Sequence, residues 1–114
     1  MTEQTNVVHP TSDETFNSDV TAYPGVCVVK FYKDNCQPCR AIKGNYIYEA
    51  RQFGDRLKFY EYDGLTNSEV AGRLGVGGWP QPIFFKNGRI VHRYEGAPHN
   101  LSLTPIIAAG LLAK

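Results

Sequence analysis

Two features that would suggest a nucleic-acid or membrane protein are missing from this 114-residue chain. Charge of one sign is not in excess, because twelve Lys and Arg stand against eleven Asp and Glu, which leaves a formal net charge of +1. The basic residues are scattered along the sequence, so nucleic acid is disfavoured as the main ligand. The longest apolar stretch, residues 101–113, is too short and too interrupted to span a bilayer.

Cysteine is scarce, and the pattern of a secretory signal is absent. Three cysteines are an odd number and cannot form a complete set of paired disulfides. The first residues, MTEQTNVVHPTSDETF, contain no basic segment followed by an apolar one, which is the pattern of a signal peptide. We therefore expect a cytoplasmic protein whose cysteines are kept reduced.

Nothing in the sequence divides the chain into parts. It contains no repeat and no low-complexity segment, and the connections between its predicted elements are short. Its content of 42% hydrophobic and 20% charged residues is that of an ordinary globular domain. A chain of this size can bury most of its apolar surface without a disulfide framework or a structural metal. We predict a single domain over residues 1–114.

Hydrophobic patterning predicts strands that alternate with helices. The predicted strands lie around Val7 and Val8 and at residues 26–32, 57–62, 82–86 and 89–95, with a hairpin turn at Asn87 and Gly88. The predicted helices follow Thr11, run from Pro38 to Gly54, begin at a cap on Asn67, and start near Thr104 and Pro105. This order predicts an α/β fold of three layers, in which about four helices flank a mixed central sheet of about five strands.

Cys36 and Cys39 form a C-x-x-C pair at the junction of a predicted strand and a predicted helix. Unpaired backbone N–H groups at a helix N-terminus favour an anion, and a thiolate is such an anion. We expect the first cysteine to be the nucleophile and the second to resolve a mixed disulfide. Pro38 lies in the first turn of the helix, where its missing N–H costs nothing.

A half-site for zinc and two unrelated buried thiols are the alternatives to a redox pair. A structural zinc site needs four ligands, but there is no second C-x-x-C. The three histidines, His9, His92 and His99, also lack the spacing of ligands. We therefore predict a redox pair and no metal. Cys27 lies alone in a buried strand and is predicted to be a packed core thiol.

Three segments of the sequence resemble those of one known family. FYKDNCQPCR resembles the strand, turn and helix of the thioredoxin active site, GVGGWPQPIFFKNG resembles the family's cis-proline loop and the strand after it, and YEGAP resembles the glycine-containing segment beyond. The similarity extends over nearly the whole chain, without insertions between these motifs. The resemblance to thioredoxins implies the thioredoxin fold and reversible dithiol–disulfide exchange with protein disulfides.

The resemblance also implies roles for individual residues. Cys36 attacks and Cys39 resolves; no cofactor binds the chain, and NADPH is used indirectly, through a thioredoxin reductase. Pro80 matches the family's proline with a cis peptide bond, and the backbone of Trp79 pairs with a bound substrate chain. The implied docking face comprises Gly78, Trp79, Pro80, Gly96 and Ala97, together with Gln37 and Pro38. From residue type alone, Trp79 can also be a surface aromatic without a role.

The clearest departure from the family concerns two charged residues. Thioredoxins usually carry a buried aspartate at the position of Lys30 and a lysine at the position of Glu61, so the two charges are exchanged. An unpaired lysine in an apolar strand costs several kcal/mol, and Glu61 falls on the neighbouring strand. We predict a partly buried ion pair beneath the cysteines, the alternative being that both side chains reach solvent at strand ends.

The exchanged charges bear on the chemistry of the cysteines. A protonated Lys30 stabilises a nearby thiolate and so favours a more oxidising couple, while Glu61 offsets part of this field. Gln37 stands where thioredoxins usually have glycine, and the residues between the cysteines tune the redox poise. Lys30, Glu61, Gln37 and Pro38 are therefore candidate tuning residues.

The predicted function is that of a monomeric protein disulfide reductase. One alternative is a thiol oxidant or disulfide isomerase of the same fold, which Gln37 and Lys30 keep open. The other is a non-catalytic binding subunit of a larger assembly, in which the cysteines are incidental.

Overall fold

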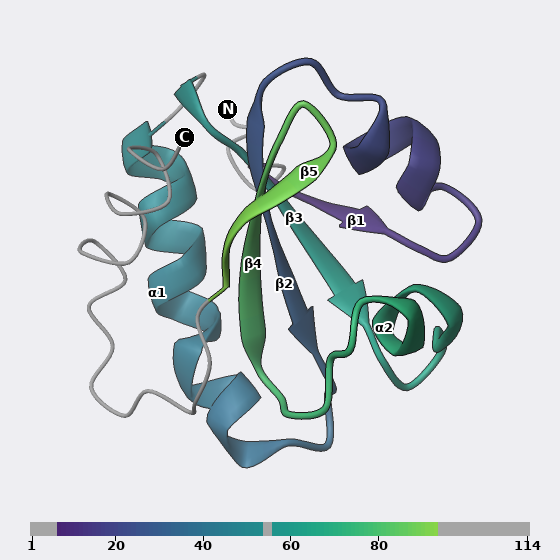
Figure 1. Cartoon of the computed structure of the whole chain (residues 1–114). Coiled ribbons are helices and arrows are strands. Elements are labelled where there is room, and N and C mark those ends of the chain that lie inside the picture. The colour runs from purple at the N-terminus through teal and green to yellow at the C-terminus, as the bar shows by residue number, and fades with distance from the viewer. Residues whose placement is uncertain (1–6, 54–55, 94–114) are drawn as a thin grey trace.

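The computed structural model describes residues 7–53 and 56–93, and these contain one five-stranded sheet in the order β1-β3-β2-β4-β5. Strands β1 (Val8–Thr11), β3 (Lys58–Asp63) and β2 (Val26–Tyr32) pair in parallel, whereas β4 (Gln81–Lys86) and β5 (Arg89–Arg93) are antiparallel additions. Figure 1 shows β2 near the middle of the sheet. The predicted mixed sheet of five strands is confirmed.

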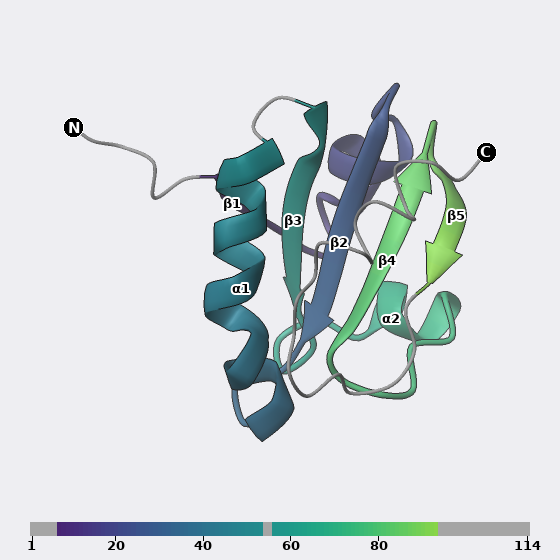
Figure 2. The ribbon, with the colours of Figure 1, turned by 90° about the vertical axis from the view of Figure 1, so that its left-hand side faces the viewer.

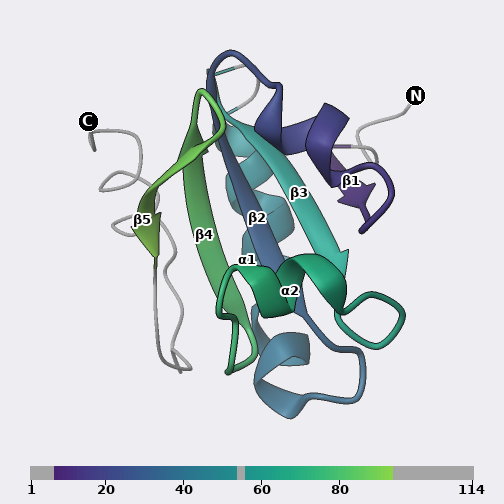
Figure 3. The ribbon, with the colours of Figure 1, turned by 45° about the vertical axis from the view of Figure 1, so that its right-hand side comes forward.

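Helices cover both faces of this sheet. Helix α1 (Gln37–Phe53) lies on one face, while the five-residue π-helix η2 (Asn17–Thr21) and the short helix α2 (Glu69–Arg73) lie on the other. Figures 2 and 3 show the resulting three layers from two further sides. The helix predicted to start near Thr104 and Pro105 lies outside the described residues. No helix in the described part of the chain is both long and apolar enough to cross a membrane.

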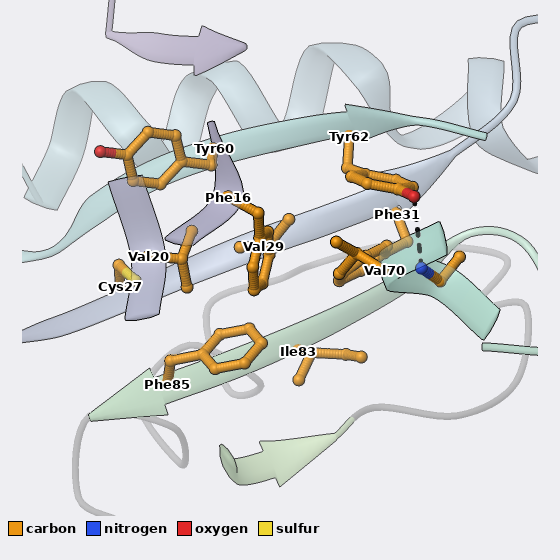
Figure 4. Close-up of a cluster of buried hydrophobic side chains, with 11 residues drawn as sticks. Phe16, Val20, Cys27, Val29, Phe31, Tyr60, Tyr62, Val70, Ile83 and Phe85 are labelled. Carbon is orange, nitrogen blue, oxygen red and sulfur yellow. Dashed lines mark hydrogen bonds between the residues drawn. The ribbon is translucent and has the colours of Figure 1, made fainter. Parts of the chain in front are cut away.

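The two faces of β2 belong to two separate hydrophobic clusters. Side chains alternate along a strand, so Val28 points to the α1 face, where it packs with residues such as Ile42 and Tyr46. Val29 and Phe31 point to the opposite face and pack with residues of η2, α2, β3 and β4 (Figure 4). Because β2 is buried on both faces, its nearly continuous apolar sequence is explained.

The C-terminal ends of β2 and β3 bring distant segments together. Tyr32 and Asp63 are neighbours at these ends, and the backbone N–H of Gly64 donates to the carbonyl of Tyr32 at 2.7 Å. The first residue of β4, Gln81, pairs with Phe31 at the same edge. The loops before α1, after β3 and before β4 therefore meet at one end of the sheet.

The N-terminus of α2 differs from the prediction of a cap at Asn67. The N-cap residue is Ser68, whose side chain makes no capping hydrogen bond. The backbone N–H groups of Ser68, Glu69 and Val70 instead donate to the carboxylate of Asp13, at 2.9 to 3.0 Å. Asn67 accepts a hydrogen bond from the backbone of Asp13, so it ties the same two segments together. The cap comes from a distant loop because a carboxylate satisfies several N–H groups at once.

Candidate active site

The two cysteines of the C-x-x-C pair differ in exposure. Cys36 directly precedes α1 and is half-buried, whereas Cys39 lies in the first turn and is only 3% exposed. The backbone N–H of Cys39 donates to Sγ of Cys36 at 3.3 Å. Both cysteines are free thiols. One sulfur can therefore be reached from solvent, while the other lies directly behind it.

The loop before β4 supplies the other side of the cysteine site. The peptide bond between Trp79 and Pro80 is cis, and the thiol of Cys36 donates to the carbonyl oxygen of Trp79 at 3.6 Å. Pro80 is buried. Residues that are 43 positions apart in the sequence thus form one site.

The indole ring of Trp79 contacts both a lysine and a glycine. Nζ of Lys33 is 4.8 Å from the ring centre. A Cβ atom added to Gly64 would be 2.5 Å from Cη2 of the indole, so the ring occupies the space of a side chain there. Trp79 is half-buried. The ring is therefore held in place rather than free on the surface, although its role in docking stays a prediction.

The rest of the predicted docking face is described only in part. Gly78 and Gln37 are exposed, and Pro38 is half-buried near the cysteines in the first turn of α1. Gly96 and Ala97 lie outside the described residues.

The predicted ion pair between Lys30 and Glu61 is confirmed. The two residues are neighbours on β2 and β3, and Nζ of Lys30 is 3.7 Å from Oε1 of Glu61. The Lys30 side chain is only 3% exposed and that of Glu61 is 31% exposed, so the alternative that both side chains reach solvent is wrong. The effect of the pair on the redox chemistry stays a prediction.

Two aromatic rings complete the surroundings of Lys30, and the sequence analysis missed them. Nζ lies 5.0 Å from the ring centre of Tyr32 and 4.8 Å from that of Tyr46. Tyr32 is two residues from Lys30 and so shares its face of β2, which is a signal that the sequence contains. Tyr46 is on the buried side of α1, and its position over Lys30 depends on how the helix packs. The aromatic faces stabilise the ammonium by cation–π interaction.

Opposing effects act on the pKa of Lys30. Burial lowers the pKa of Lys30 from its usual value, and the positive charge of Lys43 lowers it further. The carboxylate of Glu61 acts in the opposite direction, as does the nearby Cys39. The net effect is a pKa below the usual value for lysine.

Cys39 is difficult to ionise in the dithiol state. Burial and the hydrogen bond with Cys36 raise the pKa of Cys39 to about 11. The backbone N–H of Lys33, which donates to Cys39 Sγ at 3.4 Å, acts against this shift, and so does the charge of Lys30. Cys39 is consequently protonated at neutral pH.

The third cysteine lies in the core, away from the C-x-x-C pair. Cys27 is fully buried, and burial raises the pKa of its thiol to about 12, so it is an inert core residue as predicted. Within residues 7–53 and 56–93, no three His, Cys, Asp or Glu side chains are grouped so that they could hold a metal ion.

Comparison with known proteins identifies the family. The thioredoxin family model matches residues 7–109. The chain is 35% identical to "Thioredoxin Asp f 29" of Aspergillus fumigatus over 94 residues, which are 81% of this chain and 84% of that protein. It is 32% identical to "Thioredoxin Y, chloroplastic" of Oryza sativa subsp. japonica over 88 residues, 76% of this chain and 52% of that protein.

A longer relative shows the same similarity in one of its parts. The chain is 27% identical to "Protein disulfide-isomerase A3" of Gallus gallus over 85 residues, 75% of this chain but 17% of that protein. The chain thus spans about half the length of the rice relative and a small part of the chicken one. The family model nevertheless covers nearly all of this chain, including both cysteines and the cis peptide bond. The chain therefore belongs to the thioredoxin family.

Proposed function

We propose that the chain is a protein disulfide reductase of the thioredoxin type. The observation that supports this most directly is the asymmetry of the cysteine pair. Cys36 is accessible and accepts a hydrogen bond from the N–H of Cys39, whereas the Cys39 sulfur is buried behind it. Such a pair transfers two electrons in an ordered sequence, because only one sulfur can meet a substrate disulfide first.

In the first step Cys36 attacks. Its thiolate forms a bond to one sulfur of the substrate disulfide, and the other substrate sulfur leaves as a thiolate that takes up a proton. The N–H of Cys39 donates to the Cys36 sulfur and helps to hold negative charge there before attack. The backbone of Trp79, whose carbonyl lies next to Cys36, pairs with the docked substrate chain in this proposal.

In the second step Cys39 resolves the mixed disulfide. Cys39 loses its proton and attacks Cys36 Sγ, the bond between Cys36 and the substrate breaks, and the second substrate thiol is released. Bonding of Cys36 to the substrate removes the hydrogen bond that helps to raise the pKa of Cys39. Lys30 then stabilises the Cys39 thiolate, which makes it a positioning residue for this step. The products are two substrate thiols and a Cys36–Cys39 disulfide.

The disulfide must be reduced again before another cycle. We propose that a thioredoxin reductase supplies the two electrons from NADPH, and that the chain itself holds no cofactor. We further propose that it acts as a cytoplasmic monomer. The small size and the balanced charge are consistent with a monomer.

Trapping of the intermediate tests the proposal. The Cys39→Ser variant should accumulate a mixed disulfide with a disulfide-bonded protein substrate, visible as an added mass that dithiothreitol removes. The Cys36→Ser variant should form none and should lose reductase activity. Cys27→Ser should behave like the unmodified chain, because Cys27 is buried away from the site. Trapping by Cys36→Ser, or activity without Cys36, would contradict the proposed order.

The opposite direction of reaction is the second candidate, and Lys30 is the observation that favours it. A buried cation beside Cys39 stabilises the thiolate and hence the dithiol, which is the property of an oxidant. Against this, burial raises the pKa of Cys39 in spite of Lys30, so the Cys39 thiolate itself stabilises the dithiol little at neutral pH. Faster oxidation of a dithiol substrate than reduction of its disulfide, in a buffer at the potential of the glutathione pool, would favour this candidate.

A further inference from the structure

A groove beside the buried cysteine is lined by an excess of cationic side chains. It has a volume of about 410 Å³, and Cys39 forms part of its wall. Four cations line it, namely Lys30, Lys33, Arg40 and Lys43. The formal net charge of the whole chain is only +1, so this concentration of positive charge is local.

Carboxylates near the groove compensate this charge only in part. Of its described lining residues, two are acidic, Asp34 and Glu61. Glu61 is engaged by Lys30, and Asp34 is exposed. Asp63 lies nearby at the end of β3, where its carboxylate accepts a hydrogen bond from the backbone of Leu65 at 2.9 Å. The groove therefore retains a positive excess.

The positive surface continues along α1. Arg40, Lys43 and Arg51 are exposed, and their spacing of three and eight residues places them on one face of a helix with 3.6 residues per turn. At 1.5 Å per residue, Arg40 and Arg51 are about 16 Å apart along the axis. All residues of α1 are described, and its single carboxylate, Glu49, is buried. Basic residues that look scattered in the sequence thus form one exposed face of α1. Figure 2 shows α1 as the layer on one side of the sheet.

We propose that this basic face, defined by Arg40, Lys43 and Arg51 together with the groove, binds an acidic segment of the disulfide-bearing protein substrate. The inference rests on the proposed reductase function and narrows its substrate class to proteins with a run of Asp or Glu close to the disulfide. An extended segment rises about 3.3 Å per residue, so about five residues span the face. Complementary charge raises the rate of encounter and is screened by salt.

An acidic protein segment suits this face better than a nucleic acid or a membrane does. Binding of nucleic acid commonly uses about six to ten phosphate contacts, more than three helix cations and a groove provide. An interfacial membrane helix buries a broad apolar face, whereas the buried side chains of α1, such as Ile42 and Tyr46, pack on the sheet. The face also begins at the wall formed by Cys39, which connects it to the redox site.

Three disulfide-bonded peptides test the inference. They share one sequence and differ only in a four-residue run beside the cysteine, made of Glu, Gln or Lys. The readout is the ratio of kcat/KM for the Glu peptide to that for the Gln peptide. We expect a ratio of about five at low salt, because an exposed ion pair contributes a factor of about 1.5 to 5. At 1 M salt the screening length is about 3 Å, and the ratio should approach one.

A pair of double variants assigns the preference to the basic face. Lys43→Glu with Arg51→Glu should bring the ratio at low salt to one or below. Lys86→Glu with Arg89→Glu makes the same change of charge on exposed residues near the opposite end of the sheet, and should keep the original ratio. Circular dichroism checks that both variants fold. A ratio of one for the unmodified chain, or an equal loss in both variants, would overturn the inference.

A binding measurement separates this inference from the proposed function. Fluorescence anisotropy follows the binding of a labelled Glu-rich peptide that contains no cysteine. If the chain reduces no disulfide but binds this peptide through Lys43 and Arg51, the reductase function fails and the basic face stands. If the Gln peptide is reduced but the Glu peptide is neither preferred nor bound, the inference alone fails. Stronger binding to single-stranded DNA or to phosphatidylserine vesicles would also overturn it.

Discussion

Nζ of Lys30 lies 4.8 Å from the centre of the Tyr46 ring, and Tyr46 is itself fixed by its hydroxyl group, which donates to the carbonyl of Tyr60 at 2.6 Å. A cation–π contact away from water stabilises an ammonium by about 2 kcal/mol. Together with Glu61 this contact opposes the burial that lowers the pKa of Lys30. Both the Tyr46 ring and the Glu61 carboxylate therefore stabilise the buried ammonium of Lys30 next to Cys39.

Replacement of Lys30 by methionine should slow the resolving step. Methionine fills a similar volume without charge, so Cys39 loses a cation that lowers its pKa and becomes harder to ionise. Each unit of increase in the pKa reduces the thiolate tenfold but raises its nucleophilicity, so the net loss of rate is about threefold per unit. The lifetime of the mixed disulfide, followed by rapid acid quenching and mass spectrometry, should lengthen, and its pH profile should move to higher pH.

Lys58→Met is the matched control for this experiment. Lys58 is an exposed lysine at the start of β3, whereas the other end of this strand, at Asp63, lies near the cysteine site. Its replacement therefore removes the same charge at a distance from the cysteines. It should leave the lifetime of the mixed disulfide unchanged. An equal lifetime in Lys30→Met and the unmodified chain would show that Lys30 has only a structural role.

Asp13→Asn should destabilise the fold at neutral pH. The Asp13 carboxylate accepts hydrogen bonds from the Tyr62 hydroxyl at 2.6 Å and from the backbone N–H groups at the start of α2. Loss of such bonds costs about 1–3 kcal/mol, and because Asp13 is half-exposed we expect the lower end of this range. The urea midpoint at pH 7 should fall, whereas in the exposed control Glu14→Gln it should not.

The pH dependence of the Asp13 effect has a definite sign. Burial raises the pKa of Asp13, but the hydrogen bonds from Tyr62 and α2 outweigh it and lower the pKa from 3.8 to about 2. A carboxyl group with a lowered pKa stabilises the fold above pH 3.8, and this stability is lost as the pH falls toward 2. The difference in unfolding free energy between Asp13→Asn and the unmodified chain should therefore shrink near pH 2. A difference that is constant with pH would refute this assignment.

Gly64→Ala should displace the ring of Trp79. The added methyl group would lie 2.5 Å from Cη2 and 2.8 Å from Cζ3 of the indole, and a rigid ring can only move as a whole. Because Trp79 is the only tryptophan, its emission spectrum reports the displacement directly. We expect a changed spectrum and a several-fold lower kcat/KM for protein substrates. Gly77→Ala, with no described atom within 4 Å of the new methyl group, should leave both unchanged.

Substitution of two further glycines by alanine should change the stability of the fold in opposite directions. At Gly44, inside α1, no described atom lies within 4 Å of an added Cβ, so Gly44→Ala should stabilise the fold by about 0.5–1 kcal/mol. At Gly88 the backbone has φ +82°, and an added Cβ would collide with the carbonyl oxygen of Thr21, so Gly88→Ala should destabilise it by more than about 1 kcal/mol. Thermal unfolding of the two variants decides both, and a shift of the same sign in both would contradict the geometry.

Local patterns in the sequence predict much of this structure. The apolar run Val26–Tyr32 predicts a strand buried on both faces, and Asn87 with Gly88 predicts the β4–β5 hairpin, where both residues have positive φ. The ion pair of Lys30 and Glu61 is also predictable, because a lysine in such a strand requires a partner on its neighbour. These predictions succeed because each of these features is determined by a few neighbouring residues or by the pairing of two strands.

Relationships across the fold are not predictable in this way. The capping of α2 by Asp13 joins segments more than 50 residues apart, and the local cap expected at Asn67 does not form. The spacing of Arg40, Lys43 and Arg51 predicts one face of a helix, but the continuity of this face with the groove beside Cys39 depends on the packing of α1. The contact of Trp79 with Gly64 depends on the approach of two loops whose sequences contain no complementary pattern.

The reduction potential of the Cys36–Cys39 couple tests the proposed reductase function most directly. The measurement is a titration against glutathione and dithiothreitol buffers at pH 7, followed by Trp79 fluorescence and checked by the mass of alkylated thiols. Since burial raises the pKa of Cys39 to about 11 in spite of Lys30, the buried sulfur contributes little thiolate stabilisation to the dithiol. We expect a couple more reducing than the glutathione pool, below about −260 mV. A value above about −200 mV, in the range of oxidants and isomerases, would contradict the reductase function.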